Sequence, residues 1–152
     1  MITRRNALRL MAAVPAAAVL ATRAQAATPQ IYAEDGIAID GTDPVGYFTE
    51  GRPVAGDPSI TLDWNGATWR FASEDSRARF EADPEAFAPQ YGGYCAFAVS
   101  QGYTASTVPQ AWTIHEDKLY LNFSRSVRRR WERDIPGHIE MANANWPSVL
   151  NA

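Results

Sequence analysis

The chain has 152 residues, of which 46% are hydrophobic, 11% aromatic and 20% charged, so disordered and fibrous classes are excluded and one globular domain is expected. Four of the 14 basic residues and none of the 17 acidic residues lie in the first 26 positions, which leaves 10 basic and 17 acidic residues in the remainder, a net charge of −7. An acidic domain repels polyanions, so nucleic acid is not expected as a partner.

Residues 1–26 are predicted to be a cleaved signal peptide. The pair Arg4-Arg5 lies in a basic segment, the apolar segment 10–21 is shorter than the about 20 residues that span a bilayer, and Ala24-Gln25-Ala26 is a small-residue cleavage pattern. The arginine pair and the alanine-rich, weakly hydrophobic segment indicate the twin-arginine route, with a general secretory signal as the alternative. Either route predicts an exported, periplasmic protein with no stable membrane span.

Extended segments and a hairpin are predicted in the first half of the mature chain. Residues 27–37 are expected to be a linker or first strand, ahead of a domain that covers residues 38–150. Asn65-Gly66 joins the alternating segments 60–64 and 67–71, and this dipeptide between two such segments is a strong hairpin signal. Apolar residues alternate on both arms, so one side of the ribbon is expected to face the core.

Short helices and a second hairpin are predicted in the rest of the chain. Ser73 is a suitable N-cap for one helix, and Pro84 and Pro136 suit the first turns of two others. The predicted elements are helices over 74–82, 84–88, 125–133 and 136–146 and strands over 112–115 and 118–123. Together they predict an α+β fold, with one small antiparallel sheet made from two β-hairpins and packed by three or four short helices in a single domain.

The only cysteine, Cys95, follows the glycine pair Gly92-Gly93. Glycine permits positive φ, so the thiol is expected just after a tight turn. One cysteine excludes an intrachain disulfide. Two interpretations of Cys95 stay open at this point: a nucleophilic, redox or metal-binding thiolate, or a small buried apolar residue.

Two groups of motifs resemble the YHS-domain family. The order Asp43-Pro44-Val45, hairpin, Phe71-Ala72-Ser73, short helix and Asp83-Pro84-Glu85 is similar to that family's small unit over about residues 38–90. The rest of the chain looks like a narrower group of exported YHS-like proteins, often described as selenoprotein relatives. The segments that carry this second likeness are Gly92-Gly93-Tyr94-Cys95-Ala96, Ala111-Trp112-Thr113-Ile114, Asp134-Ile135-Pro136-Gly137 and Ala144-Asn145-Trp146-Pro147.

The resemblance implies an active sulfur at Cys95 but no metal site at the other positions where the family has cysteine. Some members of the narrower group are reported to have selenocysteine at the place that matches Cys95, which implies an active sulfur there. The cysteines of the wider family are thought to bind a transition metal, but this chain has Gly46, Ala72 and Ser76 or Arg77 in their places. A cysteine-rich metal site is therefore not expected.

Five other residues are candidates for a site around Cys95. Tyr94, Tyr103 and Trp112 are candidates to line its pocket, with core packing as the alternative for the tyrosines. His115 and His138 are weak candidates to bind copper or zinc together with the thiolate, with surface exposure as the alternative.

Two charged groups have simpler explanations. Asp40, Asp43 and Glu50 lack the spacing of a calcium loop and are expected to be solvated loop acids. The arginines at 125, 128–130 and 133 form a basic helix face that suits anions, with pairing to nearby acids as the usual alternative.

The expected function follows from Cys95. The sequence favours an exported YHS-like protein with one functional thiol, which binds a soft transition metal or takes part in thiol redox chemistry with an unknown protein or small-molecule partner. The alternative is a non-catalytic partner-binding module in which the cysteine is buried and inert.

Overall fold

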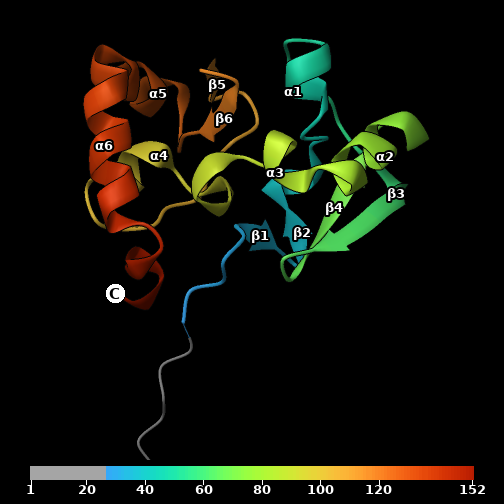
Figure 1. Cartoon of the computed structure of the whole chain (residues 1–152), viewed down its shortest axis with the longest axis horizontal. Helices are drawn as coiled ribbons and strands as arrows, with labels where there is room; N and C mark the ends of the chain where they lie inside the picture. The colour runs from blue at the N-terminus through green and yellow to red at the C-terminus, as the bar shows by residue number, and fades with distance from the viewer. Residues whose placement is uncertain (1–26) are drawn as a thin grey trace, which may run out of the picture.

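The computed structural model describes residues 27–152, so the predicted signal peptide lies outside the described residues (Figure 1). The predicted α+β class is confirmed in one domain, with two groups of elements. We call residues 33–87 the sheet half and residues 90–151 the helical half. The strands are β1 (Ala33–Glu34), β2 (Ile37–Ala38), β3 (Asp57–Trp64), β4 (Ala67–Phe71), β5 (Trp112–His115) and β6 (Lys118–Leu121). The α-helices are α1 (Gly46–Thr49), α2 (Glu74–Ala82), α3 (Pro84–Phe87), α4 (Ala96–Ser100), α5 (Arg125–Trp131) and α6 (Ile135–Asn145).

Both predicted hairpins form, but they do not join into one antiparallel sheet. β3 and β4 belong to a four-stranded sheet of order β1-β2-β4-β3, whereas β5 and β6 pair only with each other. The prediction of a single antiparallel sheet fails because β2 pairs with β4 in parallel, with Ile37 opposite Thr68. β4 therefore has β2 on one side and β3 on the other, and the second hairpin forms a separate two-stranded sheet.

The helices number six in the described part of the chain, where three or four were predicted. The two that were not predicted, α1 and α4, have four and five residues. Such short helices show too few turns to reveal a helical period in the sequence. None of the helices within residues 27–152 is both long and apolar enough to cross a bilayer.

The core of the sheet half lies between α2 and the β3–β4 hairpin. The Asn65-Gly66 turn has φ angles of 50° and 81°, as a tight hairpin turn requires, and Ala67, Trp69 and Phe71 of β4 are buried as predicted. Phe80 of α2 is fully buried, and its ring centroid lies 5.0 Å from that of Trp69. Burying a phenylalanine side chain stabilises a fold by about 1.5–3 kcal/mol, so these rings fix α2 on the sheet.

The helical half has its own core of aromatic rings. α4, α5 and α6 lie together beside the β5–β6 hairpin, on the opposite side of the molecule from the four-stranded sheet (Figure 1). Trp131 of α5 is fully buried, with its ring centroid 5.1 Å from that of Tyr120 on β6. α5 begins at the N-cap Ser124, whose hydroxyl accepts a hydrogen bond from Val127 N–H at 3.1 Å.

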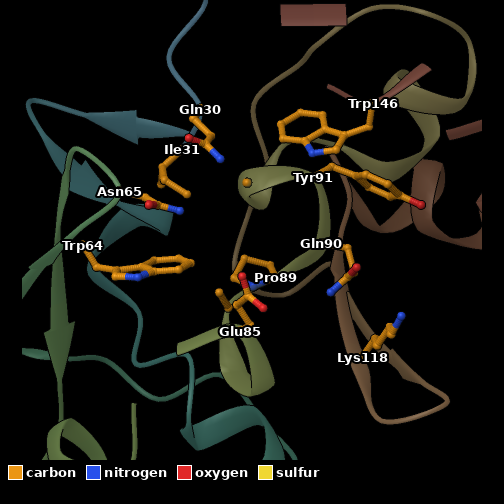
Figure 2. A pocket seen from close by; sticks show the side chains of 12 residues that line it. Gln30, Ile31, Trp64, Asn65, Glu85, Pro89, Gln90, Tyr91, Lys118 and Trp146 are labelled. Atoms are coloured by element: carbon orange, nitrogen blue, oxygen red, sulfur yellow. The ribbon is translucent and has the colours of Figure 1, made fainter. Parts of the chain in front are cut away.

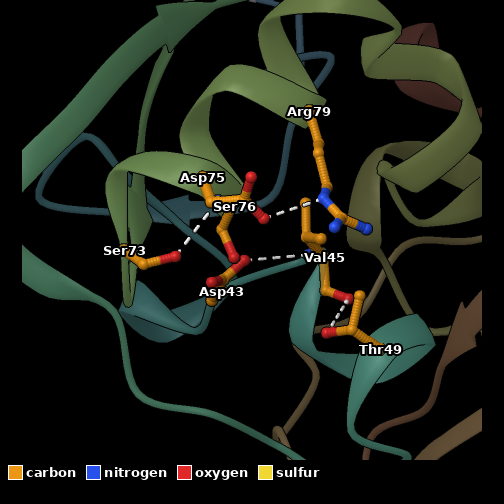
Figure 3. Close-up of polar contacts among 7 residues, drawn as sticks. All are labelled: Asp43, Val45, Thr49, Ser73, Asp75, Ser76 and Arg79. Carbon is orange, nitrogen blue, oxygen red and sulfur yellow. Dashed lines mark hydrogen bonds and ion pairs between the residues drawn. The ribbon is translucent and has the colours of Figure 1, made fainter.

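Asp43 connects the start of α1 to the end of β4. Its carboxylate is 1% exposed and accepts hydrogen bonds from Val45 N–H at 2.9 Å and from Ala72 N–H at 3.0 Å. Figure 3 shows the bond to Val45 beside the Ser73 cap of α2. The expectation that Asp43 is a solvated loop acid is wrong, because its side chain is buried and each of its two oxygens accepts a hydrogen bond from a backbone N–H.

Candidate functional site

The turn before Cys95 contains three successive residues with positive φ: Tyr91 at 59°, Gly92 at 65° and Gly93 at 86°. Tyr32 N–H donates to the Gly92 carbonyl at 2.9 Å, so the segment before β1 packs directly against this turn. A Cβ atom on Gly92 would collide with the carbonyl oxygen of Gln30. The predicted tight turn is confirmed, and its glycines serve the close approach of two backbones as well as the bend.

Cys95 lies at the N-cap of α4, between that helix and the residues that follow β6. Its side chain is fully buried. The Phe123 N–H donates to Sγ at 3.3 Å, and the thiol faces Asn122 Oδ1 at 3.5 Å, where S–H is the only available donor. The backbone N–H of Cys95 donates to the Ala105 carbonyl at 3.0 Å. The thiol and the backbone groups of Cys95 therefore all have hydrogen-bond partners within the protein.

Asn122 is the buried polar neighbour of the thiol. Its side chain is 0% exposed, and Oδ1 also accepts a hydrogen bond from Phe97 N–H at 3.0 Å. That donor fixes which amide atom is the oxygen. The other amide atom, Nδ2, has no hydrogen-bond partner among residues 27–152. Asn122 lies 27 positions from Cys95 and belongs to no motif, so the sequence alone does not connect the two residues.

The electrostatics of this site oppose ionisation of the thiol. Burial raises the pKa of Cys95 above its ordinary value of 9.0, and the N–H groups of Ala98, Phe123 and Phe97 counter this only in part. The thiol is therefore protonated at neutral pH. Because the thiolate is the nucleophile and the metal ligand, this environment suppresses both kinds of chemistry.

The structure places the three predicted pocket residues in different surroundings. Tyr94 is buried in the core of the helical half, and its hydroxyl donates to the Pro29 carbonyl at 2.7 Å. Burial raises the pKa of this phenol. Tyr103 is 51% exposed, while Trp112 packs on the core of the sheet half with its ring centroid 5.6 Å from that of Tyr47.

The two histidines lie on different elements. His115 ends β5, with Nε2 3.9 Å from Glu116 Oε1. His138 lies in α6, where Nδ1 donates to the Trp131 carbonyl at 2.9 Å and the ring packs on Phe97 with centroids 5.4 Å apart. In the part of the chain that the structure describes, no group of three or more His, Cys, Asp or Glu side chains is placed to hold a metal ion.

A cleft of about 370 Å³ opens between the two halves, away from the cysteine (Figure 2). We call it the interhalf cleft. Trp64 and Asn65 of the β3–β4 hairpin face Tyr91 and Trp146 of the helical half across it. Cys95 does not line it. The sequence analysis missed this cleft because the residues that line it are distant along the chain and meet only after the two halves pack.

Comparison of the chain with family models, with curated proteins and with solved structures finds no match.

Proposed function

We propose that this chain is an exported YHS-like domain that binds a ligand without catalysing a reaction, and that Cys95 is a structural thiol. The burial of Cys95 is the observation that carries this proposal, because the side chain is 0% exposed and lines no part of the interhalf cleft. A reactive thiol needs access to its substrate and a substantial thiolate fraction. Full burial and a raised pKa favour neither condition.

The surroundings of the thiol support the same proposal. Sγ accepts a hydrogen bond from Phe123 N–H and its proton faces Asn122 Oδ1, so the group links α4 to the end of β6. A buried cysteine with both a donor and an acceptor partner acts as a small core residue. The export and the YHS-like assignment are supported by the signal-like first 26 residues and by the motifs around Asp43 and Cys95.

A second candidate function, a working sulfur in metal or redox chemistry, is favoured by one observation. Backbone N–H groups of Phe97, Ala98 and Phe123 lie around Sγ. Such donors stabilise a thiolate once it forms. This candidate requires an opening motion that brings Cys95 to the surface, since the described conformation shields it completely.

Thiol labelling of the full chain separates the two candidates. We expect Cys95 to react with a maleimide at neutral pH only after urea unfolds the protein, with the labelling transition matching the unfolding transition followed by tryptophan fluorescence. The control is the urea-unfolded chain, which must give one labelled thiol per molecule. Rapid and complete labelling of the native protein at neutral pH would overturn the structural assignment. Zinc or copper(I) binding that disappears in Cys95→Ser would establish the metal version instead.

A further inference from the structure

The interhalf cleft has the dimensions of a small-molecule site. Its volume of about 370 Å³ lies within the range of roughly 300–1,000 Å³ that is usual for ligand pockets. Its walls come from both halves of the domain, with the end of β3 and the β3–β4 turn on one side, and Lys118 of β6 and Trp146 at the end of α6 on the other (Figure 2). Ligand sites form preferentially at such boundaries between packed units.

Two indole rings are the largest apolar side chains that line the cleft. Trp64 is held by edge contacts with Trp69 and Phe80, at centroid distances of 5.8 and 5.6 Å. Trp146 is held by an edge contact with Tyr91 at 6.0 Å. Each of these two indoles keeps part of its surface exposed while its neighbours fix its orientation. They are rigid aromatic platforms for a ligand with an apolar face.

Three side-chain amides provide the neutral polar groups of the cleft. Gln30, Asn65 and Gln90 line it, and the structure records no side-chain hydrogen bond from any of them to another residue within 27–152. Asn143 and Asn145 of α6 differ, because the first accepts from the Tyr91 hydroxyl at 3.0 Å and the second donates to the Val99 carbonyl at 2.8 Å. The amides of the cleft thus keep donors and acceptors for a ligand.

The charges of the cleft cancel. Glu85 and Lys118 are its only charged lining residues, and neither forms an ion pair with a residue that the structure describes. One acid and one base create no net field that favours a cation or an anion. A ligand suited to this lining is neutral, has several hydroxyl or amide groups and has an apolar face.

We propose that the interhalf cleft binds a neutral saccharide of one or two rings. A pyranose ring presents an axial C–H face that stacks on an indole, while its equatorial hydroxyls accept and donate hydrogen bonds at the ring edge. Trp64 and Trp146 would supply the stacking surfaces, and Gln30, Asn65 and Gln90 the hydrogen bonds. The inference rests on the proposed function in that it takes the domain to be a binding domain, but it gives Cys95 no part.

Titration of the full chain with maltose, cellobiose and N,N′-diacetylchitobiose tests this proposal. We expect at least one disaccharide to bind saturably, seen by calorimetry and by a change in tryptophan fluorescence. The double variant Gln30→Ala/Gln90→Ala should weaken that binding roughly tenfold or more, since two ligand hydrogen bonds are lost. Gln30 is exposed and Gln90 half-buried, so the fold should tolerate both changes. Gln110→Ala, an exposed glutamine outside the cleft, is the matched control and should bind like the parent protein.

Two further measurements test the proposal: binding to the variant Trp64→Phe, and titration of the parent protein with glycine betaine and with inorganic phosphate. Trp64→Phe keeps a ring against Trp69 and Phe80 but shortens the platform, so it should weaken binding and reduce the fluorescence response. Failure of all three disaccharides to bind, or binding that the cleft variants leave unchanged, would overturn the proposal. Saturable binding of the zwitterion glycine betaine or of inorganic phosphate in their place would also overturn it. None of these outcomes alters the thiol labelling, so the two proposals fail independently.

Discussion

One buried polar group in each half of the domain holds local structure together, and the two differ in how completely they are satisfied. In the sheet half, both carboxylate oxygens of Asp43 accept hydrogen bonds from backbone N–H groups. In the helical half, Asn122 uses Oδ1 for Phe97 N–H and for the Cys95 thiol, while Nδ2 has no partner within residues 27–152. Both side chains are almost completely shielded from solvent.

Because of this difference, the buried polar group of the sheet half contributes more to stability than that of the helical half. A buried polar group with all its partners fixes the backbone segments that donate to it, whereas an unpaired buried donor subtracts from the stability that its group contributes. Asp43 therefore fixes the junction of α1 and β4 firmly, and the Cys95–Asn122 contact holds α4 less strongly. The motifs at Asp43 and at Cys95 thus both have structural roles, and the hydrogen bonds of Asp43 are the stronger of the two sets.

The largest expected effect comes from breaking the Asp43 contacts. Asp43→Ala leaves one buried and one partly buried backbone N–H group without acceptors and should lower the free energy of unfolding by about 3 kcal/mol. Asn122→Ala leaves Phe97 N–H and the weak S–H donor of Cys95 without an acceptor, but it also removes an unpaired donor, so its cost should be smaller, about 1–2 kcal/mol. Urea unfolding of the three proteins gives the comparison.

Asp57→Ala is the control for Asp43→Ala. Asp57 also accepts two hydrogen bonds, from the N–H and the hydroxyl of Ser59, but it lies on the surface where water replaces them. Its stability should stay close to that of the parent protein. An Asn122→Ala variant as unstable as Asp43→Ala would contradict the ranking of the two halves.

The next effect concerns Gly92, where the segment before β1 meets the helical half. Gly92→Ala combines a positive φ of 65° with a collision against the Gln30 carbonyl oxygen. Gly102→Ala has a φ of 90° but no atom within 4 Å of the added Cβ, so it isolates the backbone strain alone. We expect about 1 kcal/mol for Gly102→Ala and at least twice that for Gly92→Ala in urea unfolding. If both variants lost the same free energy of unfolding, the close contact between Gly92 and the Gln30 carbonyl would not contribute to stability.

Local features of the sequence predicted much of the fold. Asn65-Gly66 identified the first hairpin, Ser73 identified the start of one helix, and Gly92-Gly93 identified the tight turn. Each of these signals acts over a few residues, through positive φ or through capping of exposed N–H groups. Turns and helix starts that depend on a few neighbouring residues can therefore be predicted from a single sequence.

Long-range contacts decided what the sequence did not reveal. The parallel pairing of β2 with β4 depends on which edge of a hairpin is free, and no residue pattern near Ile37 records that choice. Asn122 and Phe123 meet Cys95 from 27 and 28 positions away, and the lining of the interhalf cleft comes from several separate elements. The burial of Cys95 follows from these contacts, so both interpretations of the thiol fitted the sequence alone.

The smallest expected effect is a change of stability with pH that belongs to Cys95. Burial raises the pKa of this thiol in the folded state, so the unfolded chain loses its proton at a lower pH than the native protein does. The contribution of the group to stability is complete below the unfolded value near 9.0 and falls as the pH rises toward the folded value. Buried tyrosines with raised pKa add a similar loss at higher pH, so the variant Cys95→Ala is needed to isolate the thiol.

Between pH 7 and pH 9.5, the parent protein should lose more unfolding free energy in urea than Cys95→Ala does. Equal losses would mean that the thiol ionises as easily in the folded protein as in water. The sulfur of the helical half would then be accessible to solvent, whereas the Asp43 carboxylate of the sheet half is buried.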